Sequence, residues 1–542
     1  MKQRDFLWIG GVAVLLLLLL WGVMKLAGSQ QAVPAGTAEG AQVIFTPEEH
    51  FFEGSVTVNA VCQYAKADKY TLFYTFGADP AVHGKQLKKE GFTLKPRQGE
   101  EVSCYTVRMV AKFPDGTCSK EAVHSYFVGE NIQERFDISV FSLTVDPEDY
   151  QGEKGIYTNY DEQGKEWEKP VHVEYFSPAG EQLLAQDAGI RIHGGYSRTK
   201  AMKSYRLYAR ADYDENHNSF NCPFFPDAAD AQGEPITEYK RLVLRSSGND
   251  MNHTFVRDAL AQTLASEAGF PDTEKVLPTA LFINGTYQGF YWAQDFISGK
   301  YFKTVYGKHE GTLKESDHKE NAVDTREENL EFPELAALDL TVEGNYKQVT
   351  DTIDVENYLF YYAVNTILDN EDWPQTNSLS YRYSPAPGEE YGSGVLDGRW
   401  RFILHDNDMI LGLGSNHPYR ECLKAVLDPD AVKHHSKTLD LFPYSPLFAA
   451  LMEREDCRQY YVNKVKELTD GVFSPAHMNE VLDSLTAMQK NELSHYYKEC
   501  AYADGKTMAD YAGELAKLRQ AIDGSRDSIR QQIFDLWGMD IR

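Results

Sequence analysis

The sequence predicts an α+β protein with an all-β segment near its N-terminus and a helical C-terminal part. Three observations carry this prediction. Apolar and polar residues alternate with period two between residues 43 and 130, strands and helices mix from residue 137, and Glu/Lys-rich amphipathic stretches fill residues 445–540. The chain has 542 residues, of which 42% are hydrophobic and 25% are charged. This composition is typical of a globular protein with several domains and excludes a disordered one.

Residues 1–28 are predicted to form a transmembrane helix that acts as a signal anchor. Phe6–Met24 contains 19 residues without a charge, which as a helix would span about 28 Å, the thickness of a bilayer core. Two cations precede this run, so the rest of the chain is expected on the exported side as a single-pass membrane protein. No A-x-A cleavage site follows closely. The alternative is a cleaved signal peptide, which would leave a secreted protein.

Residues 29–42 are small and almost uncharged, and we interpret them as a flexible linker. Residues 43–130 are predicted to form a small all-β sandwich, because short runs of period two are separated by Gly, Pro and Asp. The predicted strands are Ser55–Cys62, Tyr70–Thr75, Tyr105–Ala111 and Ala122–Val128.

Residues 137–542 are predicted to form a second, larger unit. Its strongest local signal is the hairpin Thr279–Trp292, because Asn284-Gly285 is typical of a two-residue turn. The other predicted elements are strands at 171–176, 188–192, 204–209, 241–244 and 400–404, helices at 254–268 and 355–368, and helical structure from about 445. Residues 307–330 are highly charged, and we expect an exposed loop there.

Charge and cysteine content exclude some classes of protein. Acidic residues outnumber basic ones by 81 to 54, which gives a net charge of −27 and argues against nucleic acid as a partner. Seven cysteines occur without a C-x-x-C pair, which argues against a zinc ribbon or a thioredoxin-type site. Cys62, Cys104 and Cys118 share one region, where they could form one disulfide.

The first chemical motif is a glycine-containing turn between two predicted strands. It includes Arg191, Gly194 and Gly195, and Lys203 follows on the next strand. Glycines allow backbone N–H groups to approach phosphate oxygens, and a lysine can add a point charge. The alternative is a plain turn followed by a solvated lysine.

The second motif follows an apolar helix and includes Asp372 and Asn377. Protein kinases use the same D-x-x-x-x-N spacing, in which the Asp orients the acceptor hydroxyl and the Asn holds a metal ion. The alternative is a turn rich in Asp and Asn.

The third motif is His405-Asp406-Asn407-Asp408, at the end of an apolar strand. Carboxylates are typical ligands for Mg²⁺ or Mn²⁺. The alternative is a polar strand end. Glycine turn, lysine, D-x-x-x-x-N and strand-end Asp nevertheless follow one another in the order found in kinases.

Together these motifs resemble the CotH kinase family, the spore-coat-type atypical protein kinases, from about Ile138 to the C-terminus. The segments that carry the resemblance are G-I-Y-T-N-Y (155–160), E-W-E-K-P-V-x-V-E-Y-F (166–176), A-G-I-R-I-H-G-G-Y-S-R (188–198), K-S-Y-R-L (203–207), the helix with Arg257 near its start, I-N-G-T-Y-Q-G-F-Y (283–291), D-W-P-Q-T-N (372–377) and H-D-N-D (405–408).

The resemblance implies a kinase-like fold and metal-dependent transfer of phosphate from ATP to Ser or Thr of a protein. Asp372 matches the catalytic Asp and Asp406 the metal-binding Asp, with Asn377 as a second metal ligand and Asp408 as its acidic neighbour. Lys203, with Arg191, Gly194 and Gly195, matches the part that binds the ATP phosphates. The chain departs from the family pattern at Asp295, where Glu is frequent, and at His405, where Trp is frequent.

Residues 43–130 resemble the chitobiase/β-hexosaminidase C-terminal-type module. Phe45, Phe51, Phe52 and Gly54 begin this motif, and Y-T-L-F-Y-T-F-G-A-D-P (70–80) continues it. Such a module implies a spacer or a surface contact.

These patterns leave three functions open: a membrane-anchored kinase with a basic, Ser-rich protein substrate; a catalytically silent surface-binding or structural protein; and a carbohydrate-active enzyme. The third rests only on the module, because Asp406 and Asp408 lack the context of two facing glycosidase carboxylates. ATP is scarce outside cells, so the phosphoryl donor stays open.

Overall fold

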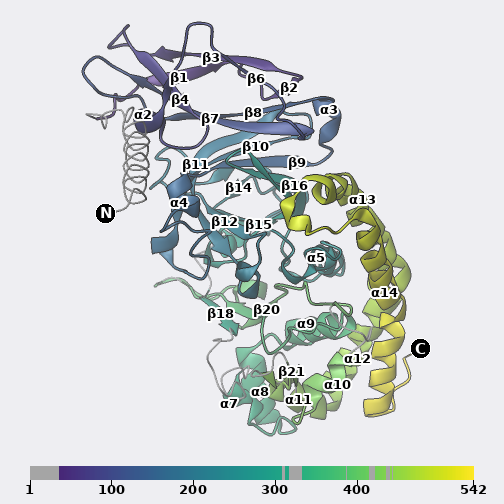
Figure 1. The fold of residues 1–542 in the computed structure, drawn as a ribbon. Helices are drawn as coiled ribbons and strands as arrows, with labels where there is room; N and C mark the ends of the chain where they lie inside the picture. Colours follow the sequence, from purple (N-terminus) through teal and green to yellow (C-terminus); the bar gives the residue numbers. More distant parts are fainter. Residues whose placement is uncertain are drawn as a thin grey trace, which may run out of the picture.

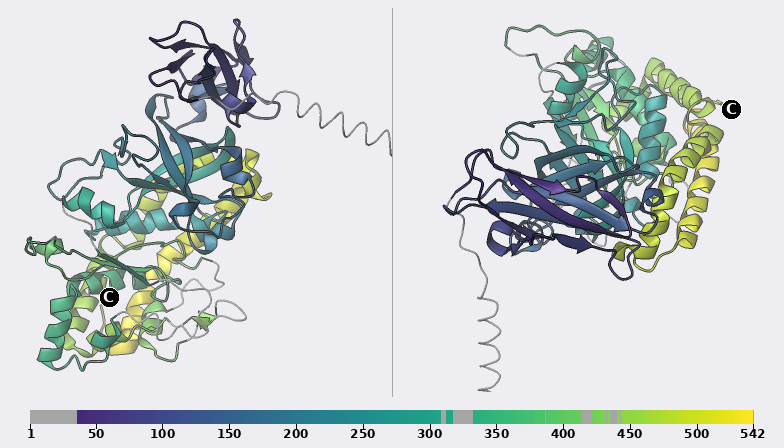
Figure 2. Two further views of the ribbon diagram at one scale, coloured as in Figure 1. Left: turned by 90° about the vertical axis from the view of Figure 1, so that its left-hand side faces the viewer. Right: turned by 90° about the horizontal axis from the view of Figure 1, so that it is seen from above.

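The computed structural model describes residues 36–307, 312–316, 332–385, 387–413, 421–431, 433–434, 440–441 and 443–541. It is a mixed α+β structure, as the sequence predicts. Figure 1 shows two sheets at one end, a barrel in the middle and helices at the other end, with α13 and α14 running along the side of the barrel, and the left view of Figure 2 shows the same order. None of the helices described in these ranges is long and apolar enough to cross a membrane. The predicted membrane segment Phe6–Met24 lies outside the described residues.

The first unit consists of two sheets that pack on a common core. One sheet has the order β1-β3-β6 and the other β2-β8-β7-β4-β5. Val58, Val107, Met109 and Tyr126 are fully buried between them. Side chains of β3 alternate between buried and exposed, which explains why period two revealed this strand. The bounds are β1 Gln42–Thr46, β2 Phe51–Glu53, β3 Val56–Gln63, β4 Thr71–Thr75, β5 Lys85–Gln86, β6 Phe92–Leu94, β7 Val102–Lys112 and β8 Ala122–Gly129, with α2 at Pro80–His83.

Two expectations for this region are corrected. The described part of the predicted linker packs on the sheets: Ala38 and Ala41 are buried, and the Ala38 N–H donates to the Cys118 carbonyl at 2.7 Å. Small side chains that suggested flexibility are thus used to fill the core. All seven cysteines are buried and free, so Cys62, Cys104 and Cys118 do not form a disulfide.

The second unit begins with a closed barrel of order β10-β11-β12-β15-β17-β16-β9. All neighbours are antiparallel except β16 and β9. The predicted hairpin is present as β16 and β17, and Asn284 and Gly285 both have positive φ angles. The bounds are β9 Ser139–Thr144, β10 Lys169–Phe176, β11 Gln182–His193, β12 Ser204–Tyr208, β15 Arg241–Arg245, β16 Val276–Ile283 and β17 Thr286–Asp295, with β13 Phe220–Asn221 and β14 Glu238–Tyr239 paired beside them.

Helix α5 (Arg257–Glu267) begins three residues later than the sequence pattern indicated. Phe255 has a φ of 59°, which a helix does not allow. The Asp250 carboxylate accepts the N–H groups of Thr254, Val256 and Arg257, which stabilises a turn before the helix.

The remaining elements form a three-stranded sheet and a set of helices. The sheet has the order β18-β19-β20, with β18 Thr312–Ser316, β19 Ser378–Arg382 and β20 Arg401–Ile403. β18 lies inside the predicted loop 307–330, most of which is outside the described residues. The helices are α3 Ile132–Arg135, α4 Pro147–Gln151, α6 Gly299–Tyr306, α7 Pro333–Ala336, α8 Glu343–Thr352, α9 Val355–Ile367, α10 Cys422–Leu427, α11 Pro446–Glu453, α12 Glu455–Asp470, α13 Pro475–Glu499 and α14 Met508–Trp537, and β21 Lys433–His434 pairs with β22 Asp440–Leu441.

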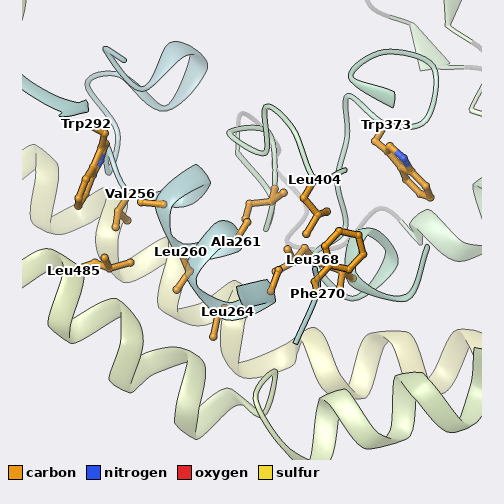
Figure 3. Packing of buried hydrophobic residues seen from close by; sticks show 14 of the residues in the cluster. Val256, Leu260, Ala261, Leu264, Phe270, Trp292, Leu368, Trp373, Leu404 and Leu485 are labelled. Atoms are coloured by element: carbon orange, nitrogen blue, oxygen red, sulfur yellow. The ribbon is translucent and has the colours of Figure 1, made fainter. Parts of the chain in front are cut away.

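A single large core joins the barrel to these helices. Figure 3 shows its centre, where residues of α5 such as Leu260 and Leu264 lie between α13 and the residues around Leu404. Leu404 directly precedes the His-Asp-Asn-Asp motif. This packing therefore fixes the end of β20 against the barrel and holds the candidate site in place.

Candidate active site

The acidic pair lies just after β20, where the chain leaves the sheet. Leu404 is fully buried, and Asp406 has a φ of 53°, so the chain turns sharply there. Asp406 and Asp408 both contact one guanidinium, that of Arg245 at the end of β15. Arg245 Nη2 donates to Asp406 Oδ1, and it lies 3.1 Å from Asp408 Oδ2. Barrel and acidic motif thus meet through this arginine.

Arg245 faces three carboxylates, because its Nε also lies 3.7 Å from Asp258 Oδ2. Burial raises the pKa of Asp408 well above its ordinary value, and the nearby charge of Asp406 adds to this effect. Burial acts in the same direction on Asp406, but Arg245 and His405 outweigh it and lower that pKa. Of the two carboxyl groups, Asp406 is therefore the one that stays ionised.

A short segment after β15 holds Asp408. The Asn249 backbone N–H donates to Asp408 Oδ2 at 2.8 Å, and its side-chain amide donates to Oδ1 at 3.2 Å. Gly248 is needed beside them, since a Cβ at this position would lie 2.1 Å from Asp408 Oδ2. Both oxygens of Asp408 are thereby engaged, whereas the Asp406 side chain is 31% exposed.

The predicted catalytic loop lies beside this motif, although Asp372 and Asp406 are far apart in the sequence. The Glu371 N–H donates to the Met409 carbonyl at 2.9 Å, and Asn377 Nδ2 lies 3.5 Å from the Asp406 carbonyl oxygen. Asp372 is close enough to Asp408 to contribute to its raised pKa. Trp373 is buried and packs on Tyr362 of α9, with ring centroids 4.5 Å apart, which anchors the loop.

The glycine turn lies at the end of β11, with Gly194 at a φ of 102° and Gly195 exposed. The Arg198 side chain donates to the carbonyls of Ile192 and Tyr160 and so ties the turn to the preceding chain. Lys203 is only 3% exposed, and its ammonium donates to the Arg198 carbonyl and lies 4.1 Å from the Tyr160 ring centre. Burial lowers the pKa of Lys203. The structure does not bring Lys203 into contact with Asp406 or Asp408.

Arg191 lies on β11 and is held by a buried carboxylate, because its Nη2 is 2.6 Å from Glu168 Oε2. Arg191, Arg198 and Arg206 line one surface hollow and give it a basic lining. Arg191 already pairs with Glu168, and the Arg198 nitrogens donate to backbone carbonyls, so an anionic ligand such as a phosphate would share these guanidinium groups with their present partners.

Three basic residues of this region, His193, Arg206 and Arg245, were not singled out from the sequence. His193 Nδ1 lies 2.7 Å from Arg206 Nη2. Burial lowers the pKa of His193 well below its ordinary value, and Arg206, Arg245 and His405 all lie near enough to lower it further. His193 therefore contacts Arg206, which lines the hollow, and lies in the electrostatic neighbourhood of Arg245, which pairs with the acidic motif. A signal for Arg245 was available, because it ends an apolar strand and precedes Ser-Ser-Gly-Asn.

The donor set fits a hard divalent cation. Carboxylate and amide oxygens are offered by Asp372, Asp406 and Asn377, and such oxygens are typical ligands of Mg²⁺. Burial, together with the charge of Asp406, raises the pKa of Asp408, and a bound cation would favour its ionised form. Asp408 is the less accessible ligand, since its oxygens already accept bonds from Asn249 and Arg245.

The fold therefore defines an α+β protein whose charged site lies between the barrel and the helical part. The family model described as CotH kinase protein matches residues 190–528, which include every predicted site residue. The chain therefore belongs to the CotH kinase protein family, as its motifs predict. No curated protein matches the chain. The match does not extend to residues 43–130, so their resemblance to a chitobiase/β-hexosaminidase C-terminal-type module stays a prediction.

Proposed function

We propose that this protein is an atypical protein kinase that transfers phosphate from ATP to Ser or Thr of a protein substrate, with Mg²⁺ or Mn²⁺. One observation carries the proposal: the loop of Asp372 and Asn377 packs against the segment of Asp406 and Asp408, although the two are separated in the sequence. A phosphoryl-transfer site needs a residue that orients the acceptor hydroxyl beside metal ligands.

Each residue has a distinct role in this proposal. Asp372 orients the acceptor hydroxyl and accepts its proton. Asp406 and Asn377 hold the metal ion, which supplies positive charge for the phosphate oxygens. Asp408 supports Arg245 and Asn249 more than it binds metal, because both its oxygens are engaged.

The phosphates of ATP are assigned to the basic side of the site. Gly194 and Gly195 offer backbone N–H groups, and Arg191 lines the hollow together with Arg198 and Arg206. Lys203 lies behind the turn, where its ammonium supports the Arg198 carbonyl. It therefore acts on the phosphates through the shape of the turn.

The proposal also covers the location of the protein and the kind of substrate it phosphorylates. The segment Phe6–Met24 anchors the protein in a membrane with its main part exported, and the net charge of −27 favours a basic, Ser-rich protein substrate over nucleic acid. N-terminal sequencing of membrane fractions tests the anchor, and a mature chain that begins near residue 30 contradicts it.

A second function, that of a catalytically silent binding protein, is favoured by a specific contact. Arg245 pairs with both Asp406 and Asp408, and an internal cation of this kind can replace a metal ion and stabilise the fold without catalysis.

Phosphate transfer from labelled ATP separates the two functions. The purified full chain is incubated with Mg²⁺ or Mn²⁺ and a basic Ser-rich peptide, and Asp372→Asn serves as the control. Transfer by the wild type that is lost in the variant supports the kinase. Equal signals from both proteins, or none with either metal, favour the silent protein.

A further inference from the structure

A second cluster of ligating side chains lies far from the acidic motif, where the first unit meets the barrel. His50 directly precedes β2, His124 lies on β8, and Glu174 lies on β10. One potential ligand atom from each of the three lies within 4.8 Å of the others. None of these residues falls within the part of the chain that the family model matches.

The hydrogen bonds of the two histidines leave one ring nitrogen of each available. His50 Nδ1 lies 2.8 Å from the Ser125 carbonyl oxygen, and His124 Nε2 lies 3.3 Å from the Glu49 carbonyl oxygen. A carbonyl oxygen only accepts, so these two nitrogens carry the protons. His50 Nε2 and His124 Nδ1 then present lone pairs, and neither bonds to any of the residues that the structure describes. A ring N–H bonded to a backbone carbonyl is the usual support of a metal-binding histidine.

Glu174 is fully buried and has no Lys or Arg ion-pair partner within the described ranges. Its carboxylate accepts bonds from the Ser125 N–H at 3.2 Å, the Ser125 hydroxyl and Gln182 Nε2 at 3.1 Å. The groups that donate these bonds orient the carboxylate, but none of them carries a full positive charge. A buried carboxylate is costly unless it is paired or binds a metal.

We infer that His50, His124 and Glu174 bind one divalent transition-metal ion, preferentially Zn²⁺, which fastens the first unit to the barrel. Two imidazole nitrogens and one carboxylate oxygen form a donor set that zinc accepts, with a fourth position for water. The two rings are stacked, with centroids 4.1 Å apart and planes inclined by 13°, so binding tilts them until both nitrogens face the ion. The site is separate from that of Asp406, whose oxygen donors suit Mg²⁺.

The test measures Zn²⁺ binding to the purified full chain after treatment with a chelator. Titration against a chromogenic competitor is expected to show one tight site per chain. His124→Gln and Glu174→Gln are each expected to weaken binding by about 100-fold or more, because removal of a ligand costs more than the 10–100-fold typical of supporting residues.

A matched control is available where the first unit meets α13. His495 lies with Glu101 and Glu499 in another group of possible ligands, where Lys498 already pairs with Glu101. His495→Gln is expected to bind Zn²⁺ as tightly as the wild type. Loss of binding in this variant but not in His124→Gln overturns the assignment, and so does the absence of a tight site in the wild type.

A second readout needs no variant. Co²⁺ in place of Zn²⁺ is expected to give the intense visible absorption of a four-coordinate site, and stoichiometric Zn²⁺ is expected to raise the thermal unfolding midpoint of the wild type. A weak six-coordinate Co²⁺ spectrum, or an unchanged midpoint, contradicts the inference even where the His124 and Glu174 variants fail to fold.

Discussion

At the scale of single residues, the feature that decides the candidate site is Arg245. It pairs with Asp406 and Asp408 and lies near Asp258. Two acids that look equivalent in the sequence therefore differ: Asp408 is buried with a raised pKa, and Asp406 is partly exposed with a lowered one. Asp406 is the carboxylate available to a cation.

We predict that Asp406→Ala lowers the affinity for Mg-ATP by at least about tenfold and leaves the fold intact. Arg245 keeps Asp408 and Asp258 as partners, so no buried charge loses all of its compensation. Calorimetric titration of Mg-ATP measures the affinity, and the exposed Asp212→Ala is the control. Equal affinity in wild type and Asp406→Ala contradicts the assignment.

We expect substitutions of Asp372 and of Asn377 to have different effects. Asp372→Asn should slow transfer by about 10²–10⁴-fold with little change in Mg-ATP affinity, because a general base acts in the transition state. Asn377→Gly should instead weaken Mg-ATP binding. Gly is chosen because Asn377 has a φ of 59°, which Ala adopts only with strain. Turnover and affinity are measured for both variants, and a wild-type rate for Asp372→Asn rules out its proposed role.

Asp295 predicts a pH dependence of stability. Burial raises the pKa of this carboxyl to about 8, above its value in the unfolded chain. Between about pH 4 and pH 8 the folded state keeps a proton that the unfolded state has lost, so stability falls as pH rises, by up to about 1.4 kcal/mol per pH unit. Asp295→Asn should lack this slope, so the difference in stability between the two proteins should change with pH. Urea unfolding across this range measures it, and parallel curves contradict the prediction.

At the scale of elements, the β16–β17 hairpin connects the barrel with the first unit. Gly285 in its turn faces the Cys104 carbonyl oxygen of β7, which a Cβ would approach to 2.6 Å. The turn thus reverses the chain and also contacts β7. The Asn-Gly pair in the sequence predicted only the reversal.

Gly285→Ala is predicted to destabilise the protein more than Gly269→Ala. Both glycines have positive φ angles, but nothing lies within 4 Å of a Cβ at Gly269. In both variants the strained backbone conformation lowers the free energy of unfolding by about 1–2 kcal/mol. In Gly285→Ala the steric overlap lowers it by about a further 1–3 kcal/mol. Urea unfolding midpoints compare them. Equal losses would mean that the contact with Cys104 is not tight.

At the scale of the whole molecule, the first unit is part of a continuous structure. Phe127, Phe136, Phe176 and Phe282 form a buried cluster that the five-stranded sheet β2-β8-β7-β4-β5 shares with the barrel. Next to it, Arg135 Nη1 lies 2.7 Å from Glu492 Oε2 of α13, and both side chains are buried. These contacts argue against a spacer that moves freely.

Glu492→Gln is predicted to cost about 3–5 kcal/mol of stability, because it leaves the buried Arg135 without its countercharge. Glu480→Gln, an exposed change on the same helix, is the control and should lie within error of the wild type. Thermal and urea unfolding measure both. A small effect of Glu492→Gln would show that solvent reaches Arg135.

Local patterns predicted much of the fold because they depend on neighbours along the chain. The Asn284-Gly285 turn, the strand Val56–Gln63 and the C-terminal helices all follow from such signals. Helix α5 was misplaced by three residues because Asp250 caps the preceding turn, and the packing of Ala38 and Ala41 was missed because small residues read as a linker.

The sequence by itself determined the α+β class and the family, because both are carried by residue type and spacing, and it predicted the residues of the acidic site from the same signals. The tertiary structure decided which charges meet: Arg245 with Asp406 and Asp408, Arg191 with Glu168, Arg135 with Glu492, and His50 and His124 with Glu174. The physical reason is that Coulomb interaction and desolvation depend on distance and burial. Separation along the chain determines neither.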